Sequence, residues 1–265
     1  MAPKLRPHGT ITRGKTALNR LRQVDVYVAL AYSSVLAGGE PLVVDVGYGA
    51  RPWTALEMRQ RWLRLNARLR LLGLEIDPQR VEAAAPLADP PAVDFRLGGF
   101  NLADVLGGRA ARVVRCYNVL RQYDEAEVEA ALAAMAAGVE EGGLLVEGTS
   151  NPSGSMVAFD CYRIVGGLPV HDALVFGTNF RSPRSPVDFQ TIAPKRLIHR
   201  MRDEAPERFF AEWRRAADLV RGRGIVSARE QWASVARELK ASGRDIDVRP
   251  RIVERGFLVI RESLS

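Results

Sequence analysis

The strongest constraint on the fold is the short apolar segment Leu42–Val46, which a glycine-rich turn follows at once. A run of this length that is apolar except for Asp45 is typical of a strand buried on both faces of a parallel sheet. The turn over residues 47–52 holds two glycines and a proline, and the proline can open a helix. After an amphipathic segment, a second apolar run over residues 70–76 carries Glu75 near its end. The sequence therefore predicts a strand–helix–strand unit with two parallel strands.

The same alternation of apolar runs and amphipathic segments continues along the chain. Up to residue 150 it predicts strands at 93–97, 112–116 and 144–147, and helices at 16–37, 53–70, 79–85 and 125–139. Beyond residue 150 it predicts strands at 156–165 and 172–179, helices at 194–203, 206–222 and 227–241, and β-type sequence at 246–261. Such alternation indicates an α/β fold with a parallel sheet. We expect a basic arm with an N-terminal helix (1–39) and one domain (40–265).

The composition excludes several classes of protein. The only cysteines, Cys116 and Cys161, rule out a disulfide scaffold and a cysteine-cluster zinc site. The histidines lie too far apart for metal-ligand spacing, so we predict no metal. No run of about 18 apolar residues occurs, and no apolar signal core follows the basic N-terminus. We therefore expect a cytoplasmic protein without a membrane partner, whose oligomeric state is open.

The chain carries 38 Lys and Arg residues against 31 Asp and Glu residues, and its formal charge of +7 is unevenly distributed. Residues 1–24 hold six bases and no acid, and residues 181–223 hold 11 bases against six acids. This asymmetry indicates an anionic partner, so nucleic acid is a candidate partner through 1–24 and 181–223. A compositional origin is the alternative, because 34 of the 38 bases are arginine and alanine is abundant, as in proteins from GC-rich genomes.

Two carboxylates and a pair of glycines form the most informative constellation: Asp45, Gly47, Gly49 and Glu75. Glycines let a ligand approach the backbone, and the turn leads into a helix at the carboxyl edge of the sheet. Glu75 can accept hydrogen bonds from both hydroxyls of a ribose. Asp45 would repel a pyrophosphate but can receive an ammonium group. These features favour S-adenosylmethionine over NAD, whose fingerprint has a third glycine; a tight turn with solvated carboxylates is the alternative without a ligand.

With these residues in place, the chain resembles the class I S-adenosylmethionine-dependent methyltransferases. The matching segments are VVDVGYG (43–49), LLGLEIDPQRV (71–81), FRLGGFNL (95–102), VVRCYNVL (113–120) and GGLLVEGT (142–149). A narrower match, over nearly the whole chain, is to a poorly characterised bacterial group of these enzymes. The resemblance implies a Rossmann-like seven-stranded methyltransferase sheet with helices on both faces, an N-terminal helical arm and a helical embellishment near the C-terminus. It also implies a cofactor-binding half (40–150) and a substrate-side half (151–265).

The resemblance assigns cofactor contacts residue by residue. The implied contacts to S-adenosylmethionine are Asp45, Gly47, Tyr48, Gly49, Glu75, Ile76, Phe100, Asn101 and Asn118. The methionine end is expected at Asp45 and the glycine turn, and the ribose at Glu75. The acidic residue that usually contacts adenine is missing, with Gly99 near its place, so Asn101 is expected to contact the adenine amino group.

The implied activity is methyl transfer from S-adenosylmethionine to an unidentified acceptor, either RNA or a small molecule. For a small molecule, residues 1–24 would act as a lid over the site. No convincing general base is present, so the catalytic residues are unknown. The candidate substrate-side residues are Tyr117, Asn118, Tyr123 and His171. The alternative is a non-catalytic module that binds S-adenosylmethionine or a nucleotide and associates with RNA, which the missing acid at Gly99 supports.

Overall fold

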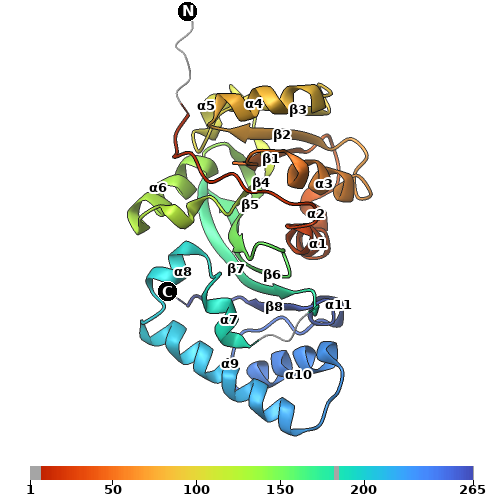
Figure 1. Ribbon diagram of the computed structural model, residues 1–265, viewed down its shortest axis with the longest axis vertical. Coiled ribbons are helices and arrows are strands. Elements are labelled where there is room, and N and C mark those ends of the chain that lie inside the picture. Colours follow the sequence, from red (N-terminus) through yellow and green to blue (C-terminus); the bar gives the residue numbers. More distant parts are fainter. Residues whose placement is uncertain (1–6, 182–184, 265) are drawn as a thin grey trace, which may run out of the picture.

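The apolar runs of the sequence form the strands of one eight-stranded sheet (Figure 1). The computed structural model describes residues 7–181 and 185–264. The strands are β1 (Leu42–Val46), β2 (Arg70–Glu75), β3 (Val93–Leu97), β4 (Ala111–Tyr117), β5 (Val139–Ser150), β6 (Met156–Val165), β7 (Leu168–Thr178) and β8 (Phe257–Ile260). Their order is β3-β2-β1-β4-β5-β6-β7-β8, in which β1 to β5 are parallel and β6, β7 and β8 each run antiparallel to the preceding neighbour.

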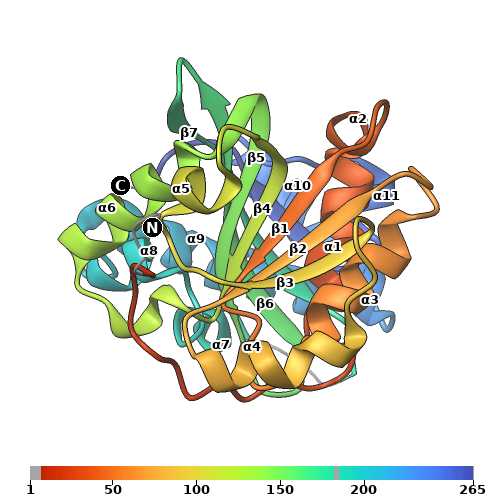
Figure 2. The same cartoon turned by 90° about the horizontal axis from the view of Figure 1, so that it is seen from above.

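Helices cover both faces of this sheet (Figure 2). They are α1 (Arg22–Ala31), α2 (Ser33–Leu36), α3 (Trp53–Trp62), α4 (Pro78–Ala84), α5 (Leu102–Leu106), α6 (Glu125–Ala136), α7 (Pro186–Gln190), α8 (Lys195–His199), α9 (Glu204–Gly222), α10 (Ala228–Ala241) and α11 (Pro250–Val253), with 3-10 turns η1 (Ala85–Leu87) and η2 (Leu120–Gln122). Side chains of α1, α2 and α3 pack on one face of the sheet, and those of α5 and α6 pack on the other. The predicted α/β, Rossmann-like fold is therefore confirmed, with eight strands where seven were expected.

The C-terminal third of the chain builds its own layer on β6, β7 and β8. Helices α7 to α10 bury apolar side chains against these strands, and Phe176 of β7 lies at the centre of an aromatic cluster. The ring of Phe176 is 5.1 Å from that of Trp213 and 5.6 Å from that of Phe189, measured between centroids. The helical embellishment near the C-terminus is thus part of a buried core and holds the antiparallel end of the sheet.

Two local predictions are wrong. The helix predicted over residues 16–37 begins only at Arg22. Asn19 adopts a left-handed conformation (φ 61°), which interrupts helical continuity, and its N–H donates to the Glu57 carboxylate at 2.9 Å. The segment 246–261 is also not β-type throughout, because α11 interrupts it between β8 and Ile246, which forms an isolated antiparallel bridge with Ile260.

The parallel strands all direct their carboxyl ends to one edge of the sheet, and the N-terminal segment crosses this edge. We call residues 7–21 the N-terminal arm; Figure 1 shows it in dark red, running across the molecule to α1. Among the residues that the structure describes, no helix is both long enough and apolar enough to span a membrane.

Candidate functional site

Two adjoining cavities lie at the carboxyl edge of the parallel strands, where ligands bind in open α/β sheets. The larger has a volume of about 760 Å³ and is bounded by the turn after β1, the segment after β4, the end of β5 and the N-terminal arm. The smaller has about 20 Å³ and lies between the ends of β2 and β3 and the arm. A volume of 760 Å³ is within the usual range for small-molecule sites, whereas 20 Å³ holds about one water molecule.

The structure brings eight of the nine predicted contact residues to these cavities. The larger cavity is lined by Asp45, Gly47, Tyr48, Gly49 and Asn118, and the smaller by Gly47, Glu75, Ile76 and Phe100. Asn101 does not line either cavity; its side-chain oxygen accepts a hydrogen bond from the backbone N–H of His8 at 3.3 Å. The order of these residues around the edge follows directly from the strand order.

The turn after β1 requires both of its glycines. Gly47 and Gly49 have φ values of 73° and 84°, which side chains rarely adopt. A Cβ at Gly47 would lie 2.6 Å from a methyl carbon of Val119, and a Cβ at Gly49 would lie 2.9 Å from the carbonyl oxygen of Gly14. The turn is thus packed against the segment after β4 on one side and against the N-terminal arm on the other.

Glu75 is held in place by backbone donors. Its carboxylate accepts from the N–H of Gly49 and from its own neighbour Ile76, both at 2.9 Å. Arg80 approaches the same carboxylate at 3.5 Å. The Glu75 carboxylate is 3% exposed, so it is pre-positioned where the first two βα turns meet. A carboxylate fixed in this way still has lone pairs for a ligand hydroxyl.

Asp45 belongs to a buried ionic network that the sequence did not predict. Arg115 of β4 donates to both oxygens of Asp45, at 2.8 and 3.0 Å, and to Asp25 of α1 at 2.6 Å. Arg61 of α3 forms a second ion pair with Asp25 at 2.8 Å. Asp45 is therefore already neutralised by Arg115, and any ligand ammonium group would share it with this guanidinium.

The ionisation of the network is set by burial and by these pairs. Burial raises the pKa of Asp25 to about 6, although Arg115 and Arg61 oppose the effect. Burial also disfavours the charged form of Arg115, but the Asp45 and Asp25 carboxylates outweigh it and raise the pKa of the guanidinium. A signal for this pairing existed in the sequence, because Asp45 and Arg115 are the charged residues inside two apolar strand segments, and the two are register partners in the sheet.

The N-terminal arm takes the place in which the sequence predicts adenine. The N–H of Phe100 donates to the carbonyl oxygen of His8 at 3.0 Å, and Thr10 is hydrogen-bonded through its N–H to the Tyr123 hydroxyl. A side chain at Gly99 would collide with the carbonyl oxygen of His8. The absence of an acidic residue at Gly99 therefore has a structural reason, since the arm packs against this turn.

Further along, the arm is fixed to the first two βα turns. Arg80 donates to the carbonyl oxygen of Thr12 at 2.8 Å, and the N–H of Ala50 donates to the carbonyl oxygen of Gly14 at 3.0 Å. Residues 12–16 then form a wall of the larger cavity. The arm is thus an integral part of the site.

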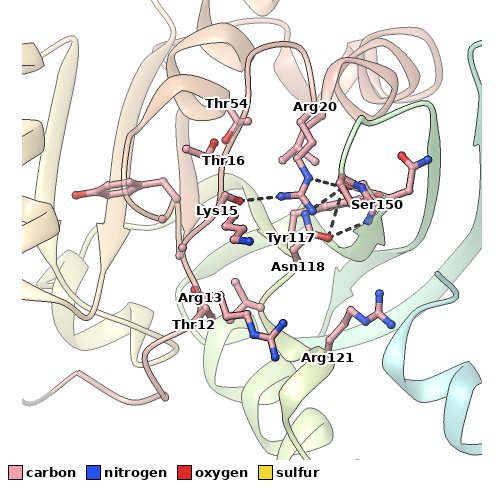
Figure 3. A pocket seen from close by; sticks show the side chains of 18 of the residues that line it. Thr12, Arg13, Lys15, Thr16, Arg20, Thr54, Tyr117, Asn118, Arg121 and Ser150 are labelled. Carbon is pink, nitrogen blue, oxygen red and sulfur yellow. Dashed lines mark hydrogen bonds between the residues drawn. The ribbon is translucent and has the colours of Figure 1, made fainter. Parts of the chain in front are cut away.

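The opposite wall of the larger cavity is a polar network at the ends of β4 and β5 (Figure 3). Asn118 has a left-handed conformation (φ 61°), and its side-chain amide oxygen accepts from the N–H of Ser150 at 2.9 Å. Arg20 of the arm donates to the Ser150 hydroxyl at 3.0 Å and to the carbonyl oxygen of Lys15 at 2.8 Å. Burial lowers the pKa of Arg20, and among the described residues it has no carboxylate partner.

Apart from Asn118, the candidate substrate-side residues have different surroundings. Tyr117 lines the larger cavity, but its hydroxyl donates to the carbonyl oxygen of Thr149 at 3.0 Å, and burial raises its pKa well above the usual value. Tyr123 lines the smaller cavity and is bound to the arm. His171 lines neither cavity and is paired with Asp160 at 2.9 Å. Hence the described lining of the larger cavity contains no free carboxylate or imidazole, and no cluster suited to a metal occurs in the described ranges.

Five of the ten described basic residues in the segment 181–223 form ion pairs. The pairs are Arg196–Asp160, Arg200–Glu125, Arg208–Glu204, Arg221–Asp218 and Arg223–Glu238. Of the remaining predicted nucleic-acid contacts, Lys4, Arg6 and Arg184 lie outside the described residues. The face formed by this segment is therefore less basic than its composition indicates.

Comparisons with known proteins add structural likeness only. No protein-family model matches this chain, and no curated protein matches it by sequence. Many solved structures share part of its architecture. The chain spans about half or less of the length of the structures described next.

Three of these structures are named methyltransferases. Magnesium protoporphyrin IX methyltransferase from Synechocystis with bound SAH is 21% identical, with a TM-score of 0.37 over 49% of this chain and 55% of that one. An O-methyltransferase family protein from Burkholderia thailandensis is 20% identical, with a TM-score of 0.31 over 47% and 38%. Coclaurine N-methyltransferase bound to N-methylheliamine and SAH is 15% identical, with a TM-score of 0.39 over 52% and 38%. At this level of likeness, function has to be argued from the site itself.

Proposed function

We propose that this chain binds S-adenosylmethionine at the carboxyl edge of its sheet and transfers the methyl group to an acceptor in the larger cavity. The observation that carries the proposal is the joint placement of Glu75 and the glycine turn. The buried Glu75 carboxylate is held by backbone N–H groups and lies beside the turn of Gly47 and Gly49. Because these glycines have no side chains, a ligand can contact the backbone of the turn. This pairing suits a ribose with an unphosphorylated substituent.

The residues present fit the two ends of this cofactor differently. The methionine end fits the larger cavity, where Gly47 and Gly49 form the floor and Asp45 is within reach of an ammonium group. The adenosine end requires a shift of the arm, because its pocket holds about 20 Å³ and the N–H of Phe100 is bonded to His8. Binding is therefore expected to be coupled to movement of residues 8–10.

Methyl transfer requires the protein mainly to align the acceptor atom with the methyl group of the cofactor. When bound, the cofactor supplies a methyl group activated by a sulfonium, and the acceptor atom displaces the sulfur in line. Glu75 would accept the ribose hydroxyls, and the glycine turn would hold the methionine end against β1. Asn118 and Ser150 would orient the acceptor from the opposite wall, where their mutual hydrogen bonds fix both side chains. An acceptor that has no proton to lose at the reacting atom would need no base.

Calorimetric titration of the purified chain with S-adenosylmethionine and S-adenosylhomocysteine tests the proposal. We expect binding of both, and a loss of about tenfold or more in affinity for Glu75→Ala, because a charged hydrogen-bond acceptor contributes about 1.5–3 kcal/mol. Glu82→Gln on the exposed side of α4 is the matched control. Absence of binding at millimolar ligand would overturn the proposed function.

The second candidate is a module that keeps the fold without catalysis. It is favoured by the hydrogen bonds of His8 to Phe100 and Asn101, which occupy the predicted adenine contacts. In that case the chain would bind neither ligand, or would bind S-adenosylhomocysteine without methylating any acceptor fraction offered with labelled S-adenosylmethionine. Transfer of label to an acceptor would exclude this candidate.

A further inference from the structure

The larger cavity has a strongly basic lining. Arg13, Lys15 and Arg20 enter it from the N-terminal arm and Arg121 enters it from η2 (Figure 3). Within residues 7–181 and 185–264, none of these four side chains has a carboxylate within ion-pair distance; Arg121 donates to the carbonyl oxygen of Thr191 at 3.2 Å. Four cations thus face one space without an internal counter-charge.

The carboxylate that lines the cavity does not balance them. Asp45 accepts two hydrogen bonds from Arg115, and Arg115 with Arg61 also neutralises Asp25, so this network is balanced internally. Arg20 is held by neutral oxygens of Ser150 and Lys15. A partly buried guanidinium held only by neutral groups costs desolvation energy that an anion from outside can recover.

The cofactor alone cannot supply that anion. S-adenosylmethionine carries a sulfonium, an ammonium and a carboxylate, so it would bring a net positive charge into the cavity. Its carboxylate can engage Arg20, which leaves Arg13, Lys15 and Arg121 for another anion. Arg13, Lys15 and Arg121 are partly hydrated at the mouth of the cavity, and a second ligand with more than one negative charge would find cationic partners in them.

We infer that the methyl acceptor is a small polyanion, with carboxylate or phosphate groups that bind to Arg13, Lys15 and Arg121; this inference rests on the proposed function. Three bases of the arm point into the cavity, and the arm closes one of its sides, which favours a ligand that enters over one that lies across the surface. In the segment 181–223, Arg196, Arg200 and Arg223 pair with acids outside the segment, which weakens the second basic face that a bound RNA would need.

The test is a titration of the complex with S-adenosylhomocysteine, using citrate and pyrophosphate as probes. We expect both anions to bind, and Arg13→Gln and Arg121→Gln each to weaken that binding by about tenfold, since a charge-assisted hydrogen bond contributes about that factor. Affinity for S-adenosylhomocysteine should be the same in both variants as in the wild type. Arg109→Gln, an exposed arginine outside both cavities, is the control and should change nothing.

Each other outcome has a defined meaning. If S-adenosylhomocysteine itself does not bind, the proposed function fails. If it binds but neither anion does, or if Arg109→Gln weakens anion binding as much as Arg13→Gln, the inference is overturned. If an RNA oligonucleotide binds, loses affinity in the Arg13 and Arg121 variants, and is not displaced by pyrophosphate, the acceptor is RNA and the small-molecule assignment is wrong.

Discussion

At the residue scale, the buried guanidinium of Arg115 pairs with two carboxylates, so its removal should lower the stability of the fold. Arg115→Met would leave Asp45 without a partner inside the core, and breaking a buried pair costs about 3–5 kcal/mol. We expect a loss of that size in the free energy of unfolding measured with urea. The double variant with Asp45→Asn should recover part of it. Arg109→Ala should stay within about 0.5 kcal/mol of the wild type; a similarly small loss for Arg115→Met would contradict the buried pairing.

Glu147 gives a prediction on the pH dependence of stability. It lies in β5 opposite Asp160 and is 1% exposed, and burial followed by the Asp160 charge raises its pKa to about 8. The folded state therefore holds this proton more tightly than the unfolded state. Its stabilising contribution is complete below the ordinary pKa of 4.5 and is lost as the pH rises through about 8.

Glu147→Gln keeps the neutral form at every pH and should flatten this decline. Each pKa unit corresponds to about 1.4 kcal/mol, so the wild type should lose on the order of several kcal/mol across the window. Urea midpoints measured across this pH range test the prediction. Asp25, whose pKa is about 6, contributes a residual slope of the same sign. Exposed Glu129→Gln is the control, and a pH profile of Glu147→Gln identical to that of the wild type would refute the assignment.

At the element scale, the N-terminal arm competes with the adenosine end of the proposed cofactor. The hydrogen bonds of His8 and Thr10 to Phe100, Asn101 and Tyr123 must break before adenine can enter. Removal of residues 1–11 should therefore raise the affinity for S-adenosylhomocysteine by roughly tenfold, because a few competing hydrogen bonds of about 1 kcal/mol each no longer oppose binding. Calorimetry measures the change.

Removal of residues 1–6 alone is the matched control, since it leaves the contacts of His8 and Thr10 in the chain. Its affinity should equal that of the full chain. If the longer truncation instead weakens binding, the arm covers the bound cofactor and does not compete with it. Far-UV circular dichroism should show that both truncated chains keep the sheet.

The arm also shows where prediction from the sequence stops. The strands β1 to β5 follow from apolar runs, because a strand buried on both faces needs little besides them. Glu75 and Asn118 then lie at the same edge of the sheet, because the carboxyl ends of parallel strands meet there. The path of residues 7–21 depends on contacts with distant turns, such as that of Thr10 with Tyr123, which is 113 residues away, and no local pattern encodes these. Asn19 shows the same limit, since its left-handed conformation ends a helical periodicity that the apolar spacing alone continues.

At the scale of the whole molecule, charge is distributed by pairing as well as by composition. Three of the bases in residues 181–223 pair with acids elsewhere in the fold, whereas three bases of the arm converge on one cavity. Net charge along the sequence predicted an anionic partner, but only the fold separates cations that are already neutralised from those that face a ligand. The proposed site for an anionic partner is therefore the larger cavity instead of an extended surface.

The continuous sheet predicts that its parallel strands and the C-terminal layer unfold together. Strand β5 pairs with β6 along seven residue pairs, and one core contains Val43 of β1 with Phe159 and Val175 of β6 and β7. Phe176→Ala, which empties the aromatic cluster under the helices, should cost about 3–5 kcal/mol. If unfolding is cooperative, the free energy of opening measured by hydrogen exchange should fall by the same amount for the most protected amides of β1 and of β7. Leu219→Ala, at a side chain that is 52% exposed, is the control and should leave both unchanged. If Phe176→Ala accelerates hydrogen exchange in β7 but leaves the exchange rate in β1 unchanged, the chain consists of two independently unfolding units.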